Sequence, residues 1–432
     1  MRSAAKKTYP AGFAYRAGAR EAKSLYCDAV SVTSLADQFG TPLYVYSAGL
    51  IRERLQKFDQ AFGAIPHTVC YSVKANSNLS VLRLLAKLGC GFDVVSGGEL
   101  ERVLTVGRSL AKKVVFSGVG KTREEMQAAL RANILLFNVE SESELEALAE
   151  VAAQVKKTAR IALRVNPDVP ADTHPYISTG LHQHKFGVPV REALRLYARA
   201  AGIKNLQVGG VSVHIGSQIT DPKPFAAAMK RVATLVRTLR KNGHEIQYVD
   251  AGGGLGISYQ HAKPDDFQKQ VAGYSKALLG SLRDLDVHLL LEPGRSIVGP
   301  AGILLTKVIY RKQNGGKKFL IVDAAMNDLL RPSLYGAYHE IVPVIKNKTA
   351  SSETVDVVGP VCESGDFLAR DRKLGRVNEG DLLAVLDTGA YGMVLSSNYN
   401  TRPRPEEVMV DERKVTVVRK RESVDDLLRL ER

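Results

Sequence analysis

Tryptophan is absent from the chain, and only four cysteines occur among its 432 residues. These cysteines, Cys27, Cys70, Cys90 and Cys362, are scattered, and no two have the C-x-x-C spacing of zinc ribbons and redox motifs. A disulfide framework is therefore not expected, and the free thiols indicate a reducing compartment, which we take to be the cytoplasm. No metal site is expected either.

Long apolar runs are also missing. Residues 134–139 form one of the longest, and it reaches only the length of a strand, so no segment is expected to span a bilayer. The N-terminus has no apolar run of the kind that signal peptides carry. Hydrophobic residues make up 45% and charged residues 24% of the chain, which is typical of globular proteins and excludes disordered, collagen-like and coiled-coil classes. The length suggests two domains, or three.

Acidic residues are in deficit, with 45 Asp and Glu against 60 Lys and Arg, which gives a net charge of +15. The basic excess is spread along the chain and is densest at residues 1–23. A nucleic-acid site would combine clustered basic residues with aromatic ones. We therefore interpret the excess as a solvated surface or a basic N-terminal arm, and expect no nucleic-acid partner.

Residues 46–299 alternate β-rich runs with helical patterns. A first helix is expected from Ala48 to Phe62 with Ser47 as its cap, followed by a strand at residues 68–73. Later strands are expected to begin near Phe92, Val114, Ile134, Arg160, Val208, Ile246 and His288. About eight βα units in about 250 residues match the size of a (β/α)8 barrel. A doubly wound sheet is the alternative, but eight units without a break favour a closed barrel.

After Pro300 the pattern changes to short strands separated by Gly, Asn and Pro. Residues 313–316 and 411–412 have the composition of hairpin turns. Residues 300–432 are therefore predicted to form an antiparallel β-domain, a barrel or a sandwich. Residues 1–45 precede the (β/α)8 barrel, and we expect them, with an apolar strand near residues 43–46, to join that β-domain.

Chemistry in such a barrel is carried at the carboxyl ends of the strands. Lys74 follows the first strand, and alternation places it on the same face as Cys70 and Ser72. A lysine at the barrel mouth can form a Schiff base, although a surface lysine is equally compatible with the position. His214 and Ser217 end the sixth strand, where a histidine can stack on a flat ring or be merely structural.

Two glycine-containing loops follow strands seven and eight. Gly252, Gly253 and Gly254 form the first, and residues 292–295, Glu-Pro-Gly-Arg, form the second. Barrels often hold phosphate at these two loops, because backbone N–H groups converge there. The pair therefore predicts a phosphate site more strongly than either loop alone, since glycine also makes tight turns.

In the predicted β-domain, Cys362 and Glu363 begin a glycine-containing loop, and carboxylates in such a loop can bind an ammonium group. Arg331 and Tyr335 can bind a carboxylate. Tyr391 lies between glycines. By spacing alone, a packing or turn role is favoured over a binding role for each of these residues.

The ordered set of motifs resembles the fold-type III pyridoxal phosphate-dependent decarboxylases, whose fold is an alanine-racemase-like barrel with a C-terminal β-domain. The motifs lie at residues 71–76, 214–217, 252–254, 292–295, 359–366 and 397–405, and the likeness covers residues 41–410. His182 and His184 fall where that family varies, so we interpret them as a loop detail rather than a metal site.

The resemblance implies pyridoxal 5′-phosphate as cofactor. Lys74 would hold it covalently, Glu292 would pair with the pyridine nitrogen, His214 would stack on the ring, and Cys362 would return a proton to the carbon that loses CO2. The implied cofactor-binding set is Lys74, Asp93, Arg164, His214, Ser217, Gly252, Gly253, Gly254, Glu292, Pro293, Gly294, Arg295 and Tyr391.

The implied substrate-binding set is Arg295, Arg331, Tyr335, Glu363 and Tyr391. The two arginines suit a second carboxylate and Glu363 suits a second ammonium, so the expected reaction converts meso-2,6-diaminopimelate to L-lysine and CO2. In the family the Cys362 loop reaches the neighbouring subunit, which implies a homodimer with shared active sites.

Three rival functions stay open. A decarboxylase of ornithine, arginine or lysine is the first, and Arg331 together with the Cys362 loop argues against it. A racemase is the second, but that family places an arginine where Glu292 stands. A partner-binding regulator derived from such an enzyme is the third, and the presence of Lys74, Glu292 and Cys362 argues against it.

Overall fold

The computed structural model describes residues 12–17, 22–169, 185–261, 266–346 and 351–432. The pair His182 and His184 lies outside this description, as do residues 1–11 and 18–21 of the basic N-terminal stretch.

The chain divides into two compact units. The barrel unit comprises Arg54–Gly256 and Asp266–Ser296, and the β-unit comprises Met1–Glu53, Ile257–Asp265 and Ile297–Arg432. Residues 46–53, 257–261 and 297–299, which the sequence pattern assigned to the barrel, thus group with the β-unit. The cause at the first boundary is β4 (Leu43–Ser47), which is a strand of the β-unit's sheet.

Eight parallel strands form a closed ring in the barrel unit. Each strand pairs with the next, and the last pairs with the first through Leu289↔His67 and Leu291↔Val69. The strands are β5 (His67–Ser72), β6 (Gly91–Val94), β7 (Val114–Phe116), β8 (Leu136–Val139), β9 (Ala159–Asn166), β11 (Leu206–Ser212), β12 (Tyr248–Asp250) and β13 (His288–Leu291). The closure confirms the predicted barrel and contradicts the doubly wound alternative. A short strand, β10 (Val188–Pro189), extends β9.

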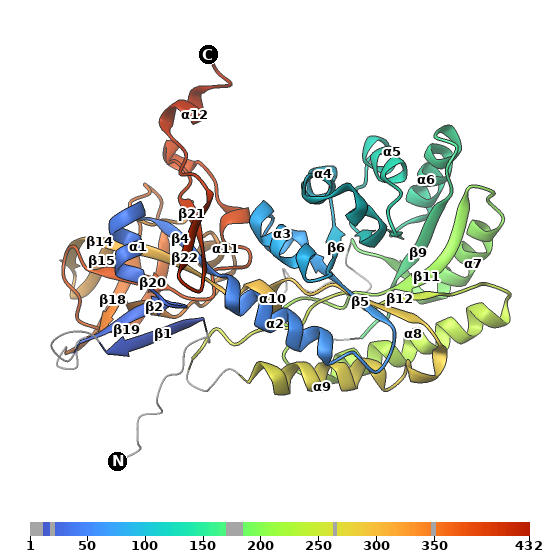
Figure 1. Cartoon of the computed structure of the whole chain (residues 1–432), viewed down its shortest axis with the longest axis horizontal. Coiled ribbons are helices and arrows are strands. Elements are labelled where there is room, and N and C mark those ends of the chain that lie inside the picture. The colour runs from blue at the N-terminus through green and yellow to red at the C-terminus, as the bar shows by residue number, and fades with distance from the viewer. Residues whose placement is uncertain (1–11, 18–21, 170–184, 262–265, 347–350) are drawn as a thin grey trace. The chain divides into compact units, whose positions relative to one another are not determined.

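A helix follows each of the first seven barrel strands (Figure 1). These helices are α3 (Leu79–Lys87), α4 (Gly97–Val106), α5 (Arg123–Ala132), α6 (Glu142–Gln154), α7 (Val190–Ala201), α8 (Lys223–Lys241) and α9 (Phe267–Leu279). Side-chain caps begin several of them. Thr122 and Glu125 form a reciprocal capping box at α5, and Ser96 accepts a hydrogen bond from the Glu99 amide at α4. Ahead of β5, α2 (Ala48–Gln60) is capped by Ser47, whose hydroxyl accepts a hydrogen bond from the Leu50 amide at 3.1 Å, as predicted.

The barrel interior is a packed core rather than a pore. Cys70, Val115, Leu136, Ala162 and Leu290, from five different strands, form one buried cluster. Cys70 therefore points inward, and Ser72 lies one step further along the same face. Lys74 follows in a 3-10 turn (Val73–Ala75), which places it at the carboxyl end of β5.

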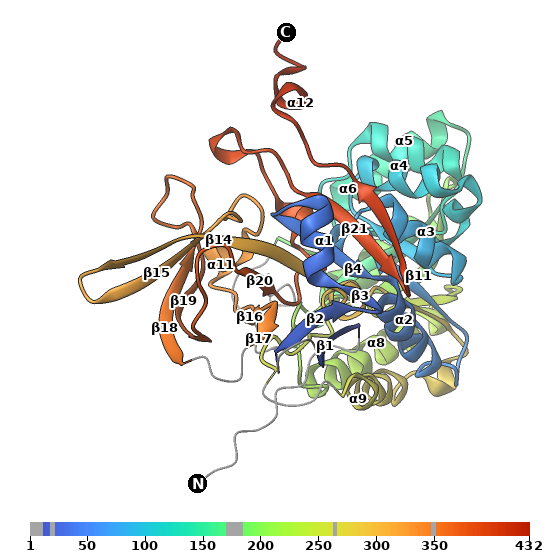
Figure 2. The ribbon, with the colours of Figure 1, turned by 60° about the vertical axis from the view of Figure 1, so that its left-hand side comes forward.

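The long strand β14 (Gly302–Asn314) organises the β-unit (Figure 2). It pairs with β4 and with β20 (Leu382–Val385) in its first half, and with β15 (Lys317–Val322) in its second. The turn between β14 and β15 contains Gly315 and Gly316, both at positive φ, so the predicted hairpin is confirmed. The remaining strands of this sheet are β16 (Ile341–Pro343), β18 (Ser352–Val358), β19 (Phe367–Gly375), β21 (Glu406–Asp411) and β22 (Lys414–Arg419).

Most pairings in the β-unit are antiparallel, but two are not. β15 runs parallel to β18, and β4 runs parallel to β21. Parallel neighbours need long connections. The stretch between β15 and β18, which contains α11 (Arg331–Tyr335), supplies one such connection. A purely antiparallel domain, which the short strands suggested, is therefore wrong at these two pairs.

A smaller sheet and three short helical segments complete the chain. The sheet contains β1 (Phe13–Ala17), β2 (Lys23–Cys27), β3 (Val30–Ser31) and β17 (Ile345–Lys346). The helices are α1 (Val32–Phe39), α10 (Arg295–Val298) and α12 (Val424–Leu428). Phe13, Leu25 and Leu35 pack with Val45 and Ile303 in one buried core, so the N-terminal segment belongs to the β-unit as expected.

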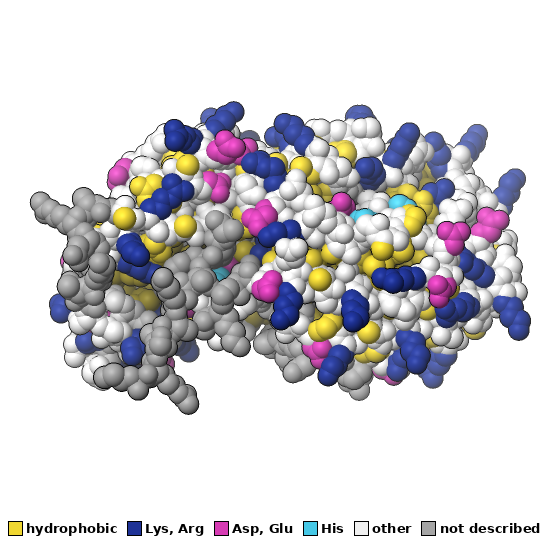
Figure 3. Space-filling view, turned by 60° about the horizontal axis from the view of Figure 1, so that its bottom comes forward, with side chains coloured by type: hydrophobic (Ala, Val, Ile, Leu, Met, Phe, Trp, Pro, Cys, Tyr) yellow, Lys and Arg dark blue, Asp and Glu magenta, His cyan; other side chains and the backbone are white. Residues whose placement is uncertain are grey.

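Figure 3 shows the distribution of charged side chains on one face of the molecule. Lys and Arg side chains are dispersed there among Asp and Glu side chains. Within the described ranges, no helix is both long and apolar enough to cross a membrane, and no group of His, Cys, Asp or Glu side chains has the arrangement of a metal site.

Candidate active site

Three buried carboxylates lie at the carboxyl ends of barrel strands. Asp93 belongs to β6, Asp250 ends β12, and Glu292 follows β13. Parallel strands in a closed ring end at one rim, which brings side chains from distant parts of the sequence together. Carboxylates are rarely buried without partners, so each should have a specific one.

Lys74 is paired with the first of these carboxylates. Its Nζ lies 2.8 Å from Asp93 Oδ2, and the Ser72 hydroxyl donates to the same oxygen at 2.8 Å. Asp93 is fully buried, whereas the Lys74 side chain is 38% exposed. The carboxylate therefore holds the amine at the barrel mouth, the position that the predicted cofactor-binding role of Lys74 requires.

Glu292 and Asp250 interact as a pair. Burial, followed by the charges of Asp250 and Asp93, raises the pKa of the Glu292 carboxyl well above its usual range. Burial also raises the pKa of Asp250, but hydrogen bonds from Glu292, Asn138 and the Gly252 amide oppose that rise. Asp250 is thus the better hydrogen-bonded carboxyl of the pair, which favours the proton on Glu292 when no cation lies beside it.

Asn138 links this pair to the rest of the barrel. Its Nδ2 donates to Asp250 Oδ2 at 2.6 Å and to the Ser117 hydroxyl at 3.0 Å, and that hydroxyl in turn donates to Glu292 Oε1 at 3.2 Å. Sequence reasoning missed Asn138 and Ser117. For Asn138, the sequence signal that could have found it is a polar residue inside the otherwise apolar strand at residues 136–139.

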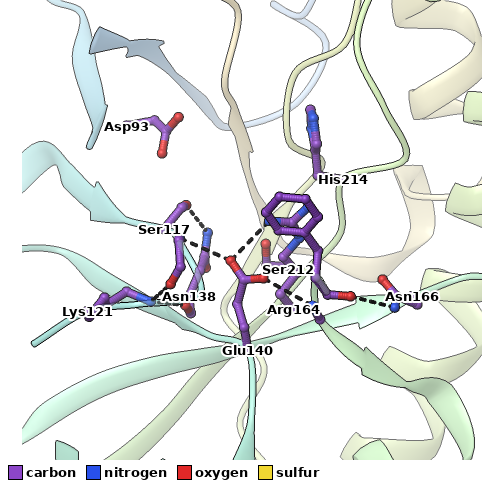
Figure 4. Close-up of polar contacts among 12 residues, drawn as sticks. Asp93, Ser117, Lys121, Asn138, Glu140, Arg164, Asn166, Ser212 and His214 are labelled. Atoms are coloured by element: carbon purple, nitrogen blue, oxygen red, sulfur yellow. Dashed lines mark hydrogen bonds and ion pairs between the residues drawn. The ribbon is translucent and has the colours of Figure 1, made fainter. Parts of the chain in front are cut away.

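Arg164 is held by a carboxylate that was also missed (Figure 4). Arg164 Nη1 lies 3.0 Å from Glu140 Oε1, and the amides of Gly118 and Gly187 donate to the same carboxylate, each at 3.0 Å. The guanidinium carbon also lies 4.8 Å from the centre of the Phe186 ring. Glu140 therefore fixes Arg164 against the loops that follow β7 and β9.

The buried ammonium of Lys121 links the loop after β7 to β8 and α6. Lys121 Nζ donates to the Gly118 carbonyl at 2.8 Å, the Asn138 carbonyl at 2.7 Å and Glu144 Oε1 at 2.6 Å. The pair is almost completely buried and all three donors of the ammonium are used, which is the condition for a buried charge to be tolerated.

His214 is neutral. Burial, together with the nearby charges of Arg164 and Lys74, lowers the pKa of its imidazole well below the usual value. The Gly253 amide donates to His214 Nδ1 at 3.2 Å, so Nδ1 is the acceptor and the ring proton lies on Nε2. Because the neutral imidazole is held through Nδ1 at its edge, its face can stack on a flat ring, which fits the role predicted for His214.

The two glycine loops allow very close backbone approaches. A Cβ on Gly253 would lie 2.1 Å from the Glu292 carbonyl oxygen, and one on Gly254 would lie 2.3 Å from the Gly216 carbonyl oxygen. Arg295 Nη2 donates to the Ser217 hydroxyl at 3.1 Å. The loops after β11, β12 and β13 therefore meet at Gly254, Ser217 and Arg295, where the sequence predicted a phosphate.

The β-unit carries the other predicted residues. Cys362 is exposed, and its amide donates to Asn400 Oδ1 at 3.0 Å. The Tyr399 hydroxyl donates to Glu363 Oε2 at 3.3 Å. Segment 399–401 thus supports the Cys362–Glu363 loop, although its own backbone is unusual, because Asn400 and Thr401 both have positive φ.

Arg331, Tyr335 and Tyr391 also lie in the β-unit. Arg331 begins α11 and is buried, and Tyr335 ends the same helix half-buried. Tyr391 is half-buried at a φ of 57°, a conformation that non-glycine residues rarely adopt and that its Gly-Ala-Tyr-Gly context tolerates.

The barrel mouth fits pyridoxal phosphate on its own geometry. It presents an amine for a carbonyl, a carboxyl for a ring nitrogen, an imidazole face for a ring and a glycine cradle for a phosphate. Among the residues that the structure describes, Asp93 Oδ1 and the Nε and Nη2 atoms of Arg164 are buried without a hydrogen-bond partner. Such groups are costly unless a ligand satisfies them.

Comparison with known families agrees. Residues 48–299 match the family described as pyridoxal-dependent decarboxylase, pyridoxal binding domain. The chain belongs to the pyridoxal-dependent decarboxylases. Pyridoxal phosphate is therefore its cofactor, and it is a carboxy-lyase.

Curated relatives carry a more specific name. The chain is 51% identical to the diaminopimelate decarboxylase of Vibrio cholerae over 413 residues, which is 95% of this chain and 97% of that one. It is 52% identical to the diaminopimelate decarboxylase of Pseudomonas aeruginosa over 404 residues, 93% of this chain and 95% of that one.

Solved structures give the same result. The diaminopimelate decarboxylase of M. jannaschii in complex with L-lysine has a TM-score of 0.91 and 40% identity, with 98% of both chains covered. The enzyme from Helicobacter pylori in complex with L-lysine has a TM-score of 0.87 and 42% identity over 92% of this chain and 98% of that one. The predicted fold class is thus confirmed.

The glycine cradle yields a direct prediction. Gly253→Ala places a methyl group 2.1 Å from the Glu292 carbonyl oxygen, so the loops after β12 and β13 must separate and the phosphate contacts be lost. We expect the dissociation constant of pyridoxal phosphate, measured by equilibrium dialysis, to rise at least tenfold.

Gly273→Ala is the matched control. A Cβ at this position in α9 meets nothing within 4 Å, and alanine in a helix is more stable than glycine by roughly 0.5–1 kcal/mol. Its cofactor affinity should be that of the wild type. Equal affinities in both variants would contradict the cradle.

Proposed function

We propose that the enzyme decarboxylates meso-2,6-diaminopimelate and releases L-lysine and CO2, the last step of lysine biosynthesis. The observation that carries this proposal is the 51–52% identity, over at least 93% of the chain, to diaminopimelate decarboxylases. Two solved relatives of that name bind L-lysine, the expected product.

The barrel residues would bind and orient the cofactor. Pyridoxal phosphate, when bound, supplies the electron sink that accepts the electron pair left by departing CO2. Lys74 would hold it covalently through Nζ, and His214 would stack on its ring. Ser217, Gly254, the Gly294–Arg295 backbone and Tyr391 would hold its phosphate. Gly252, Gly253 and Pro293 would complete the cofactor-binding set.

Glu292 would act on the ring nitrogen. Burial, followed by the nearby charges of Asp250 and Asp93, raises the pKa of its carboxyl. A protonated nitrogen at hydrogen-bond distance is the cation that would let Glu292 ionise at low cost. Glu292 would then keep a proton on that nitrogen, which strengthens the electron sink. Asp93 and Arg164 would fix the positions of Lys74 and of the ring from either side.

The β-unit residues would bind the substrate and supply the proton. The Cys362 thiol would hold a proton and deliver it to the carbon that has lost CO2. Glu363 would bind the distal ammonium. Arg331 and Tyr335 would bind the distal carboxylate, which remains in L-lysine, and Arg295 and Tyr391 would complete the set. Ornithine, arginine and lysine lack that second carboxylate. A decarboxylase of one of these amino acids would therefore have no substrate group for Arg331 to bind.

The substrate assignment is testable with the wild-type enzyme and one variant. We expect meso-diaminopimelate to be preferred over L-lysine, L-ornithine and L-arginine when CO2 release is measured side by side. Arg331→Met should lower kcat/KM for meso-diaminopimelate about tenfold to a hundredfold, the effect of losing a charge-assisted hydrogen bond. Preference for any of the other three amino acids would refute the assignment.

We also propose a homodimer in which each subunit completes the other's active site. Cys362 lies in the β-unit and Lys74 in the barrel unit, yet the Cys362 thiol must reach the substrate carbon that reacts on the cofactor held by Lys74. In a two-fold dimer, each Cys362 loop would serve the partner's barrel.

Mixing two inactive variants tests this arrangement. Lys74→Ala and Cys362→Ala, dissociated and re-annealed together, form mixed dimers in half of the population. Each mixed dimer has one intact site, so activity should recover to about a quarter of the wild-type value. Wild-type protein taken through the same procedure is the control. No recovery, with an active control, would show that Cys362 serves its own chain or is not the donor.

We place the enzyme in the cytoplasm. The support is that all four cysteines are free, three of them buried, which is the usual state in a reducing compartment.

A further inference from the structure

A buried histidine in the β-unit holds the side chain of Arg331. Arg331 Nη1 lies 2.7 Å from Nε2 of His339, and His339 is completely buried. The guanidinium carbon of Arg331 also lies 4.7 Å from the centre of the Tyr259 ring, and that ring packs edge-on against the His339 ring at 5.1 Å. The three side chains form one cluster within the β-unit.

The partners of His339 decide its protonation. His339 Nδ1 lies 2.7 Å from the Leu386 carbonyl oxygen, which can only accept a hydrogen bond. Arg331 can only donate. His339 is therefore the neutral tautomer with its proton on Nδ1, and its Nε2 accepts from Arg331. The Leu386 amide donates to the Glu340 carbonyl at 2.9 Å, so His339 is anchored to the paired strands β16 and β20.

Two contacts together fix the orientation of a planar group. The Tyr259 ring lies over the Arg331 guanidinium carbon, and the His339 hydrogen bond holds one of its terminal nitrogens, Nη1. An arginine side chain loses rotamer entropy when it is immobilised, so a preorganised guanidinium binds a carboxylate more tightly than a mobile one.

We propose that His339 is a positioning residue for substrate binding: it accepts a hydrogen bond from Arg331 and thereby aims that guanidinium at the distal carboxylate of the substrate. This inference rests on the proposed function, in which Arg331 binds that carboxylate. His339 itself does not contact the substrate, so its effect should fall on affinity rather than on the chemical step.

Two substitutions separate the two hydrogen bonds of His339. His339→Gln carries an amide oxygen at about the place of Nε2 and keeps an acceptor for Arg331. His339→Asn keeps a donor for Leu386 at the place of Nδ1 but is too short to reach Arg331. A purely structural role would make the two variants similar, whereas the positioning role separates them.

The experiment measures kcat and KM for meso-diaminopimelate, and the dissociation constant of L-lysine by calorimetry on the holoenzyme. We expect His339→Asn to raise both KM and the lysine dissociation constant about tenfold or more, with kcat within about threefold of wild type. His339→Gln should keep both values within about threefold of wild type. In an Arg331→Ala background, His339→Asn should have no further effect on KM.

Controls keep the outcomes distinct. His244→Asn, a half-buried histidine of the barrel unit, should leave both constants unchanged. If both His339 variants unfold, Tyr259→Leu against Tyr259→Phe tests the same cluster, and only the leucine variant should raise KM. If KM and the lysine dissociation constant are equal in the His339→Asn and His339→Gln variants, or equal in the two Tyr259 variants, the inference about His339 is overturned. The proposed function would still stand in that case, provided that the wild-type enzyme is active. A wild-type enzyme that releases no CO2 from meso-diaminopimelate would overturn the proposed function itself.

Discussion

The pairing of β13 with β5 is the constraint on which the barrel site depends. It closes eight parallel strands into a ring, and the carboxyl ends of all eight then meet at one rim. Asp93, Asp250 and Glu292 are about 200 residues apart at most, yet they share one buried environment. Burial and the neighbouring carboxylates raise the pKa of Glu292, so a cation placed beside Glu292 would be stabilised there. The Lys74 amine is already held in this environment by Asp93.

Periodicity was sufficient to predict most of the fold. The alternation of strands and helices predicted the eight-stranded barrel, and the glycines at residues 315–316 predicted a hairpin. Motifs at strand ends located Lys74, His214 and Glu292 because a closed barrel leaves one place where strand ends meet. The parallel pairs β15–β18 and β4–β21 were not predictable, since strand composition does not report the direction of the neighbouring strand.

The residues that support the site escaped sequence reasoning for a common reason. Asn138, Glu140 and His339 act through hydrogen bonds to other side chains, and their partners are fixed by tertiary packing alone. Each stands in a segment whose pattern predicts only a strand or a loop. For Asn138, the sequence does contain a signal, because a polar residue stands inside an apolar strand and should therefore be hydrogen-bonded. That signal does not identify the hydrogen-bond partner.

The central claim is that the barrel mouth delivers the Lys74 amine to the cofactor. The most direct test is borohydride reduction of the purified holoenzyme, followed by digestion and mass spectrometry of the peptides. The account predicts one phosphopyridoxyl group per chain, on the peptide that contains Lys74. Lys121, whose ammonium is fully buried and engaged, is an internal reference that should remain unmodified. Modification of Lys121 or of any other lysine in place of Lys74, or no modification in an active enzyme, would contradict the account.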